Sequence, residues 1–171
     1  IVPDMITMGK PMGNGIPISG LAAKENVLAA FSDKLPYFNT FGGNPVSIAA
    51  AQAVLKYIKD ENLQEHCKKA GAALLKALKE VQERHPESVG DVRGAGLFLG
   101  FEFVKNDGNK TPDKDMALNV IEMLRDEHIL TSVIGHYGNI LKLRPPMVFS
   151  ENDIDWFATS LDKCITKLEN K

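Results

Sequence analysis

The chain has 171 residues, of which 44% are hydrophobic and 25% are charged, and its formal net charge is −2. This composition is ordinary for a globular protein, and the near-neutral charge provides no basic surface for nucleic acid. No apolar run approaches the roughly 18 residues of a membrane-spanning helix, so we expect no membrane partner. The first residues show no signal-peptide pattern, and a start inside an apolar segment leads us to expect a piece of a longer chain.

The first twenty residues contain one lysine in an unusual setting. Met5, Ile6 and Met8 form an apolar run that predicts a strand. Lys10 follows in a segment rich in glycine and proline, which can continue neither a helix nor a strand. An amine held at the end of a strand suits imine chemistry with a carbonyl compound, and glycines beside it let a bulky cofactor approach the backbone. A solvated loop lysine is the alternative interpretation.

Two phosphate-binding motifs are excluded by the same residues. A Walker A loop needs a serine or threonine after its lysine, but Pro11 follows Lys10, and Asp4 occupies the position of the leading glycine. A dinucleotide-binding fingerprint needs glycine or alanine where Ile18 stands.

The segment 21–35 begins with a short apolar continuation and then predicts a brief helix that ends near Pro36. The loop 37–45 contains a glycine pair and an asparagine before proline, which favour unusual backbone angles and exposed amides. With its hydroxyl, Thr40 makes this loop a candidate phosphate site, and a plain connecting loop is the alternative.

Two helices are predicted next, over 46–60 and 62–84. In the second, apolar residues recur at spacings of three and four, and lysines cover the other side as a solvated face. In the stretch 89–104, the residues from Leu97 to Val104 alternate in the manner of a strand with one apolar face, and the glycines after Arg93 indicate close packing.

The remaining segments alternate between helices and strands. Thr111 or Asp113 caps a predicted helix, strands are expected over 129–134 and 140–144, and Ser150 with Asp153 opens the last helix as a capping box. After the helix over 62–84, the predicted order is a strand, a helix, two strands and a helix. This order indicates an α+β sheet with its helices on one side.

Lys142 and Arg144 lie two residues apart in a predicted strand and therefore share one face. Two cations away from an acidic partner could hold a carboxylate or a phosphate, with the guanidinium gripping it at two points. The alternative is a pair of surface charges on an edge strand, because Pro145 and Pro146 follow at once.

Cys67 and Cys164 lie far apart in predicted helices, so we expect reduced thiols and a cytoplasmic protein. None of the four histidines has ligand spacing with either cysteine, and no metal site is expected.

Two motifs are typical of one enzyme family. The sequence P-D-M-I-T-M-G-K-P-M-G-N-G-I-P-I-S-G, together with F-N-T-F-G-G-N-P-V-S, resembles the lysine segment and the phosphate-contacting segment of class III (omega-type) aminotransferases, which use pyridoxal 5′-phosphate. The motif G-K-P-M-G-N-G is most similar to that of the branch containing alanine-glyoxylate aminotransferase 2-like proteins and related phospho-lyases. The resemblance implies an α/β fold class, the C-terminal part of the type I fold. Residues 1–44 would end the large domain, and 45–171 would form an α+β small domain on a mainly antiparallel sheet.

The resemblance also implies residue roles. Lys10 would bind the cofactor covalently and move a proton as a general base, and Thr40 would reach the cofactor phosphate of the neighbouring subunit in a homodimer. Arg144 or Lys142 would hold the substrate anion while an amino group passes from a primary amine or amino acid to a keto acid.

The sequence departs from the family at the anion site. The family arginine lies three positions before the proline pair, where this chain has Lys142, and Arg144 directly precedes Pro145. An amino-phosphate substrate and phospho-lyase chemistry are therefore an open alternative, and a non-catalytic dimerisation module is another.

The resemblance also implies that part of the cofactor site lies outside this sequence. The family's acidic partner of the pyridine nitrogen, its aromatic stacking residue and its own-subunit phosphate loop lie upstream of Ile1. We therefore expect the chain by itself to be inactive.

Overall fold

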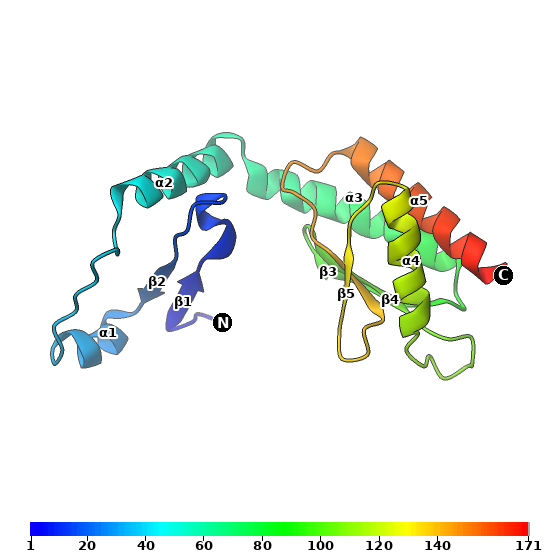
Figure 1. Ribbon diagram of the computed structural model, residues 1–171, viewed down its shortest axis with the longest axis horizontal. Helices are drawn as coiled ribbons and strands as arrows, with labels where there is room; N and C mark the ends of the chain where they lie inside the picture. Colours follow the sequence, from blue (N-terminus) through cyan, green and yellow to red (C-terminus); the bar gives the residue numbers. More distant parts are fainter. Residues whose placement is uncertain (171) are drawn as a thin grey trace. The chain divides into compact units, whose positions relative to one another are not determined.

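A computed structural model describes residues 1–170 and divides the chain into two compact units, the first formed by Ile1–Asn62 and the second beginning at Leu63 (Figure 1). The first unit contains β1 (Met5–Met8), the 3-10 helix η1 (Lys10–Gly13), β2 (Gly20–Ala23), α1 (Glu25–Ser32) and α2 (Pro45–Asp60). The second contains α3 (Leu63–Arg84), β3 (Val89–Ala95), β4 (Phe98–Phe103), α4 (Lys114–Asp126), β5 (Ser132–Ile134), β6 (Ile140–Leu143) and α5 (Glu151–Glu169).

The first unit is built on a two-stranded antiparallel ribbon. β1 pairs with β2 from Met5 opposite Ala23 to Met8 opposite Gly20. The sequence predicts β1, but β2 was expected only as an apolar continuation, because four residues are too few to establish an alternation. α2 begins as its residues dictate: the side chain of Asn44 accepts hydrogen bonds from the first turn, and Pro45 occupies the first helical position.

The second unit is a four-stranded antiparallel sheet in the order β3-β4-β6-β5, with α3, α4 and α5 packed on one face. Helices on a small antiparallel sheet are the predicted architecture, and the fold class is confirmed. Two expected caps are present. Asp113 accepts a hydrogen bond from the backbone N–H of Met116 at 2.9 Å, and Ser150 forms a capping box with Asp153. The Ser150 hydroxyl lowers the pKa of the Asp153 carboxyl.

The stretch in which one strand was predicted contains two strands, which form a hairpin. The stretch 89–104 forms β3 and β4, which pair from Ala95 opposite Phe98 and reverse direction at Gly96. Gly94 and Gly96 have φ angles of 139° and 54°, which glycine adopts without steric cost. The predicted alternation from Leu97 to Val104 is confirmed as β4. β3 was not predicted, because the residues before Leu97 show no such alternation.

The edge-strand interpretation of Lys142 and Arg144 is also wrong. β6 lies between β4 and β5, with Leu141 opposite both Phe101 and Val133. The proline pair lies beyond Leu143, the last residue of β6, so its missing N–H groups interrupt no ladder bond.

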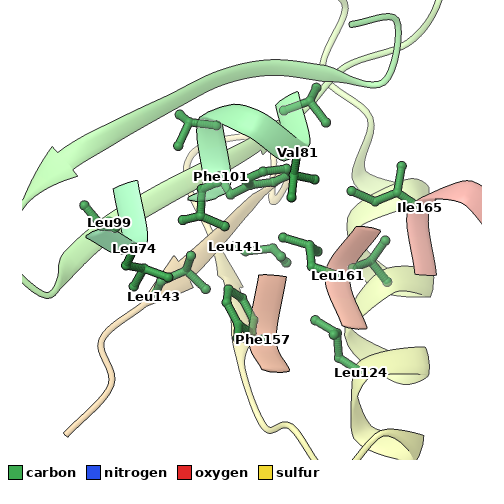
Figure 2. Close-up of a cluster of buried hydrophobic side chains, with 14 of the residues drawn as sticks. Leu74, Val81, Leu99, Phe101, Leu124, Leu141, Leu143, Phe157, Leu161 and Ile165 are labelled. Carbon is green, nitrogen blue, oxygen red and sulfur yellow. The ribbon is translucent and has the colours of Figure 1, made fainter. Parts of the chain in front are cut away.

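The hydrophobic core lies between this sheet and the three helices (Figure 2). Alternate residues of β4 and β6 point into it, and the Phe101 and Phe103 rings meet edge to face with centroids 5.3 Å apart. The helices contribute one stripe each, as the spacing predicts. The labelled side chains in Figure 2 are Leu74, Val81, Leu99, Phe101, Leu124, Leu141, Leu143, Phe157, Leu161 and Ile165. The other sheet face is free of these helices and carries Lys142.

Candidate active site

Lys10 follows β1 after one residue, Gly9, and is the first residue of η1. Its side chain is exposed, and within the part of the chain that the structure describes its ammonium group has no ion pair. The backbone after it is closed by turn hydrogen bonds, from the N–H of Asn14 to the carbonyl of Pro11 and from that of Ile16 to Gly13. The lysine is therefore presented at the end of a strand by a fixed turn, as the sequence predicts.

The backbone of Lys10 is strained. Its φ angle is 49°, in the left-handed region that a residue with a side chain enters at a cost of about 1–2 kcal/mol. Asn14 has φ 47°, and Gly15 has φ 107°. Strain of this kind is typical of functional sites, where the surrounding structure holds a side chain in one position.

The loop that carries Thr40 is shaped by Asn39. The Asn39 Oδ1 atom accepts hydrogen bonds from the backbone N–H groups of Phe41 at 3.1 Å and Gly42 at 3.0 Å. These two amides are therefore already hydrogen-bonded to Asn39. They do not form the open group of backbone N–H donors that would bind a phosphate. Thr40 itself is exposed, and Gly43 has φ 74°. The loop thus offers a hydroxyl on a locally fixed turn.

The ribbon and the loop border one hollow of about 770 Å³ within the first unit. Neither Lys10 nor Thr40 lines it, and the lining residues that precede them along the chain are Met8 and Asn39. Its walls are formed by Thr7, Met8, Ser19, Gly20, Leu21, Tyr37, Phe38, Asn39, Gly42 and Gly43. The hollow therefore lies between the β1–β2 ribbon and the loop that carries Thr40, and neither candidate cofactor-binding side chain forms part of its wall.

Lys142 and Arg144 lie at the other candidate site, in the second unit. Leu141 and Leu143 are buried, so the alternation of β6 places Lys142 on the face without helices, and Arg144 follows directly after the strand. The Arg144 guanidinium carbon is 5.6 Å from the centre of the Phe98 ring, a cation–π contact. Neither cation has an ion pair within residues 1–170.

The Glu102 carboxylate lies on the same sheet face as Lys142 but is hydrogen-bonded to other residues. Arg93 Nη1 donates to Glu102 Oε2 at 2.6 Å and to Asp91 Oδ2 at 2.7 Å. The buried Asn139 donates from Nδ2 to Glu102 Oε1 at 3.3 Å. The hydrogen bonds with Glu102 and Asp91 raise the pKa of Arg93, so it remains a cation.

Each predicted site residue thus has a definite place. Lys10 and Thr40 belong to the first unit, and Lys142 and Arg144 belong to the second. Sequence reasoning missed Asn39 and Phe98. The pattern asparagine-x-x-glycine was a signal for the first. No local signal identified the second, because its contact with Arg144 depends on strand register.

The described residues contain neither a cluster of metal-binding side chains nor a helix suited to a membrane. Within residues 1–170, no group of three or more histidine, cysteine, aspartate or glutamate side chains could hold a metal ion. In the same range, no helix combines the length and apolar character needed to cross a membrane.

Comparison with known proteins identifies a family. The profile of the family described as Aminotransferase class-III matches residues 1–165. The chain is 45% identical over 166 residues to ethanolamine-phosphate phospho-lyase homolog 1 of Caenorhabditis elegans, covering 96% of this chain and 35% of that protein. It is 39% identical over 168 residues to an alanine–glyoxylate aminotransferase 2-like protein of Drosophila melanogaster, covering 97% and 34%. The chain therefore spans about a third of the length of these relatives.

Solved structures agree with the sequence relatives. A phospholyase from Arthrobacter in complex with phosphoethanolamine superposes with a TM-score of 0.92 at 38% identity, over 97% of this chain and 39% of that one. A transaminase from the marine bacterium Virgibacillus superposes with a TM-score of 0.89 at 29% identity, over 99% and 40%. Both units of this chain thus have counterparts in known enzymes.

Proposed function

Because the chain belongs to the class III aminotransferases, a family that uses pyridoxal 5′-phosphate, we propose that it is the C-terminal part of such an enzyme. The single observation that carries the proposal is Lys10, an exposed amine on strained backbone at the end of β1, inside the matched segment. In this proposal residues 1–44 end the large domain and 45–171 form the small domain. The enzyme transfers an amino group from an amine or amino acid to a keto acid.

The residues fit the cofactor in their chemistry. Lys10 supplies the primary amine that an aldehyde requires, and Thr40 supplies an exposed hydroxyl that can donate to a phosphate oxygen. When bound, the cofactor supplies an electron sink beside the amine-bearing carbon of the substrate. Lys10 Nζ would take the proton from that carbon and return it, and the fixed turn would hold the amine in reach.

Lys142 and Arg144 would bind the anionic group of the substrate. Both are cations, and neither is paired within the described residues, so an incoming carboxylate or phosphate displaces no internal partner. Arg144 over the Phe98 ring is held in one direction, which reduces the entropy lost on binding.

A second candidate function is a phospho-lyase acting on an amino-phosphate. Lys142 replaces the family arginine, and a point charge suits a phosphate as well as a carboxylate. Relatives named for this chemistry are 45% and 38% identical to the chain. Transamination remains the first candidate because the family model that matches residues 1–165 is that of the class III aminotransferases, and relatives at 39% and 29% identity are also named for this reaction.

We also propose a homodimer in the cytoplasm. Phe38 and Phe41 flank the Thr40 loop and are 86% and 85% exposed, which suits a loop that is covered by a neighbouring subunit. In the family arrangement Thr40 would reach the partner's cofactor. The two free cysteines suit a reducing compartment.

Reductive trapping in the full-length protein tests the role of Lys10. We expect visible absorbance after addition of pyridoxal phosphate, and after borohydride a modified peptide that contains Lys10. Lys10→Ala should abolish both signals, whereas Lys34→Ala, at an exposed lysine of the same unit, should leave them unchanged. An unlabelled Lys10 would favour the non-catalytic dimerisation module.

A second assay separates the two reactions. The full-length protein is given phosphoethanolamine, with release of inorganic phosphate as the readout, and separately alanine with glyoxylate, with pyruvate as the readout. Pyruvate without phosphate release supports transamination. Phosphate release without pyruvate supports the lyase, and Lys142→Gln should then weaken the affinity for phosphoethanolamine.

A further inference from the structure

The free face of the second sheet brings one carboxylate within reach of two cations. Arg93 is opposite Gly100 in the strand register, and Gly100 is opposite Lys142. Glu102 is two residues further along β4 and points to the same face, so it is a diagonal neighbour of both Arg93 and Lys142. Diagonal pairs lie about 7–8 Å apart, within reach of long side chains.

Arg93, and not Lys142, holds this carboxylate. Glu102 Oε2 accepts from Arg93 at 2.6 Å, and Oε1 accepts from Asn139 at 3.3 Å, so each oxygen has its own donor. The Glu102 side chain is only 25% exposed. A carboxylate with this little access to water depends on its protein donors and would turn to the nearest remaining cation if one were removed.

Lys142 remains available as a result. Within residues 1–170 it forms no ion pair, although Glu102 is a diagonal neighbour. Gly100 is opposite Arg93 on β3 and opposite Lys142 on β6, and it places no side chain between these two residues. The neighbour of Gly100 on this face is Ile140, whose Cγ2 atom lies 3.2 Å from the position of a Cβ there. If Glu102 lost Arg93, its carboxylate would reach Lys142 past this one methyl group, as long side chains of diagonal neighbours can.

We infer that Arg93 is a positioning residue for the anion site: it holds Glu102 and thereby leaves Lys142 free to bind the anionic group of a substrate. The inference rests on the proposed role of Lys142. It adds a residue on a neighbouring strand that touches neither substrate nor cofactor and acts through Glu102.

The test uses the full-length protein loaded with pyridoxal phosphate. The measured quantity is the affinity for phosphoethanolamine, taken as KM where the compound is turned over and as a dissociation constant by calorimetry where it is not. In Arg93→Gln, Glu102 pairs with Lys142, and we expect affinity to fall about three- to fivefold, the size of a partly exposed ion pair, with little change in kcat. Adding Glu102→Gln to this variant should restore the affinity, because no carboxylate is left to compete.

Two variants serve as controls. Arg93→Lys keeps a cation beside Glu102 and should bind as the unchanged protein does. Arg125→Gln removes the same charge from α4, where the arginine pairs with the exposed Glu122, and should also have no effect.

The outcomes separate the inference from its premise. If Lys142→Gln binds phosphoethanolamine as tightly as the unchanged protein, the proposed role of Lys142 fails and the inference fails with it. If Lys142→Gln weakens binding but Arg93→Gln does not, only the inference is overturned. If Arg93→Gln weakens binding and Glu102→Gln fails to restore it, Arg93 has a merely structural role and the inference is again overturned.

Discussion

The two cysteines differ in their surroundings although both lie in helices. Cys164 is 1% exposed in the core, and burial, followed by the nearby Glu127 carboxylate, raises the pKa of its thiol above the ordinary value of 9.0. Cys67 is half-buried, and its Sγ lies 3.7 Å from the carbonyl oxygen of Met147. Because the thiolate is the reactive form, Cys164 is a structural thiol in the folded protein.

Thiol labelling checks this difference. With iodoacetamide at pH 8, we expect Cys67 to be modified first and Cys164 only when the second unit unfolds, with Cys67→Ser as the control. A raised folded pKa means that the contribution of Cys164 to stability is complete below pH 9.0 and is lost as pH rises through the folded value. Equal labelling rates at pH 8 would contradict the burial of Cys164.

His85 joins the ends of α3 and α5 through two carboxylates. Its Nδ1 lies 2.7 Å from Glu169 Oε2, its Nε2 lies 3.1 Å from Asp162 Oδ1, and the ring is 6% exposed. A ring nitrogen that carries a hydrogen donates to the carboxylate beside it, so the ring is a shared partner of Glu169 and Asp162.

Replacing this ring should therefore lower stability. We expect His85→Ala to cost about 2 kcal/mol, since it removes a buried ring that is hydrogen-bonded to two partly buried carboxylates. Thermal unfolding, compared with His136→Ala at an exposed loop histidine, measures the effect. A melting temperature equal to that of the control would show that Arg84 and Ser88, which also bond these carboxylates, suffice.

At the same scale, sequence alone predicts the positions of some site residues and not the contacts of others. Lys10 at the end of a strand and Lys142 on the same face as Arg144 follow from local periodicity. The pairing of Arg93 with Glu102 does not, because it depends on the register of a hairpin that was expected as one strand. Asn139 as a second donor to Glu102 depends on β6 lying beside β4, which no local pattern encodes.

Among the elements, α3 approaches the β3–β4 turn through two glycines. A Cβ atom built on Gly71 would lie 2.2 Å from the backbone carbonyl carbon and oxygen of Gly96. No flexible side chain can move to relieve such a contact, so the close approach of helix and turn requires glycine at position 71.

Substitution of this glycine tests the approach. We expect Gly71→Ala to destabilise the protein by about 1–3 kcal/mol, even though alanine is the better helix former. Gly96→Ala should cost less, because its nearest neighbour would be an ordinary 3.8 Å away and only the φ of 54° opposes it. Ala72→Ser, on the exposed side of α3, is the control, and equal melting temperatures for Gly71→Ala and Ala72→Ser would contradict the packing.

Helices and strands also differ in how well the sequence predicts them. The boundaries of α2, α3 and α5 follow from apolar spacing and from the caps at Asn44 and Ser150, all of which are local signals. β2 and the β3–β4 hairpin were missed, because short strands are defined by partners elsewhere in the chain. The inner position of β6 was missed for the same reason.

In the molecule as a whole, the two units differ in how much of their apolar surface they cover. The second buries a continuous cluster that includes Phe101, Leu124 and Ile165. In the first, only Gly13 is buried, and large apolar side chains from Met5 to Tyr57 are exposed. Since burial of apolar surface is the main source of stability, the first unit by itself is held together mainly by backbone hydrogen bonds and turns.

Hydrogen exchange of the 171-residue chain tests this difference. Amides of α3, β4, β6 and α5 should exchange slowly, at rates set by unfolding of the core, while those of residues 1–62 should exchange orders of magnitude faster. If the chain is part of a longer homodimeric enzyme, as proposed above, the first unit should be protected as well in that enzyme, because upstream residues and a second subunit would cover its exposed apolar side chains. Equal protection of both units in the 171-residue chain would mean that the first unit has a stability of its own, and the case for a partner that covers the Thr40 loop would lose its physical basis.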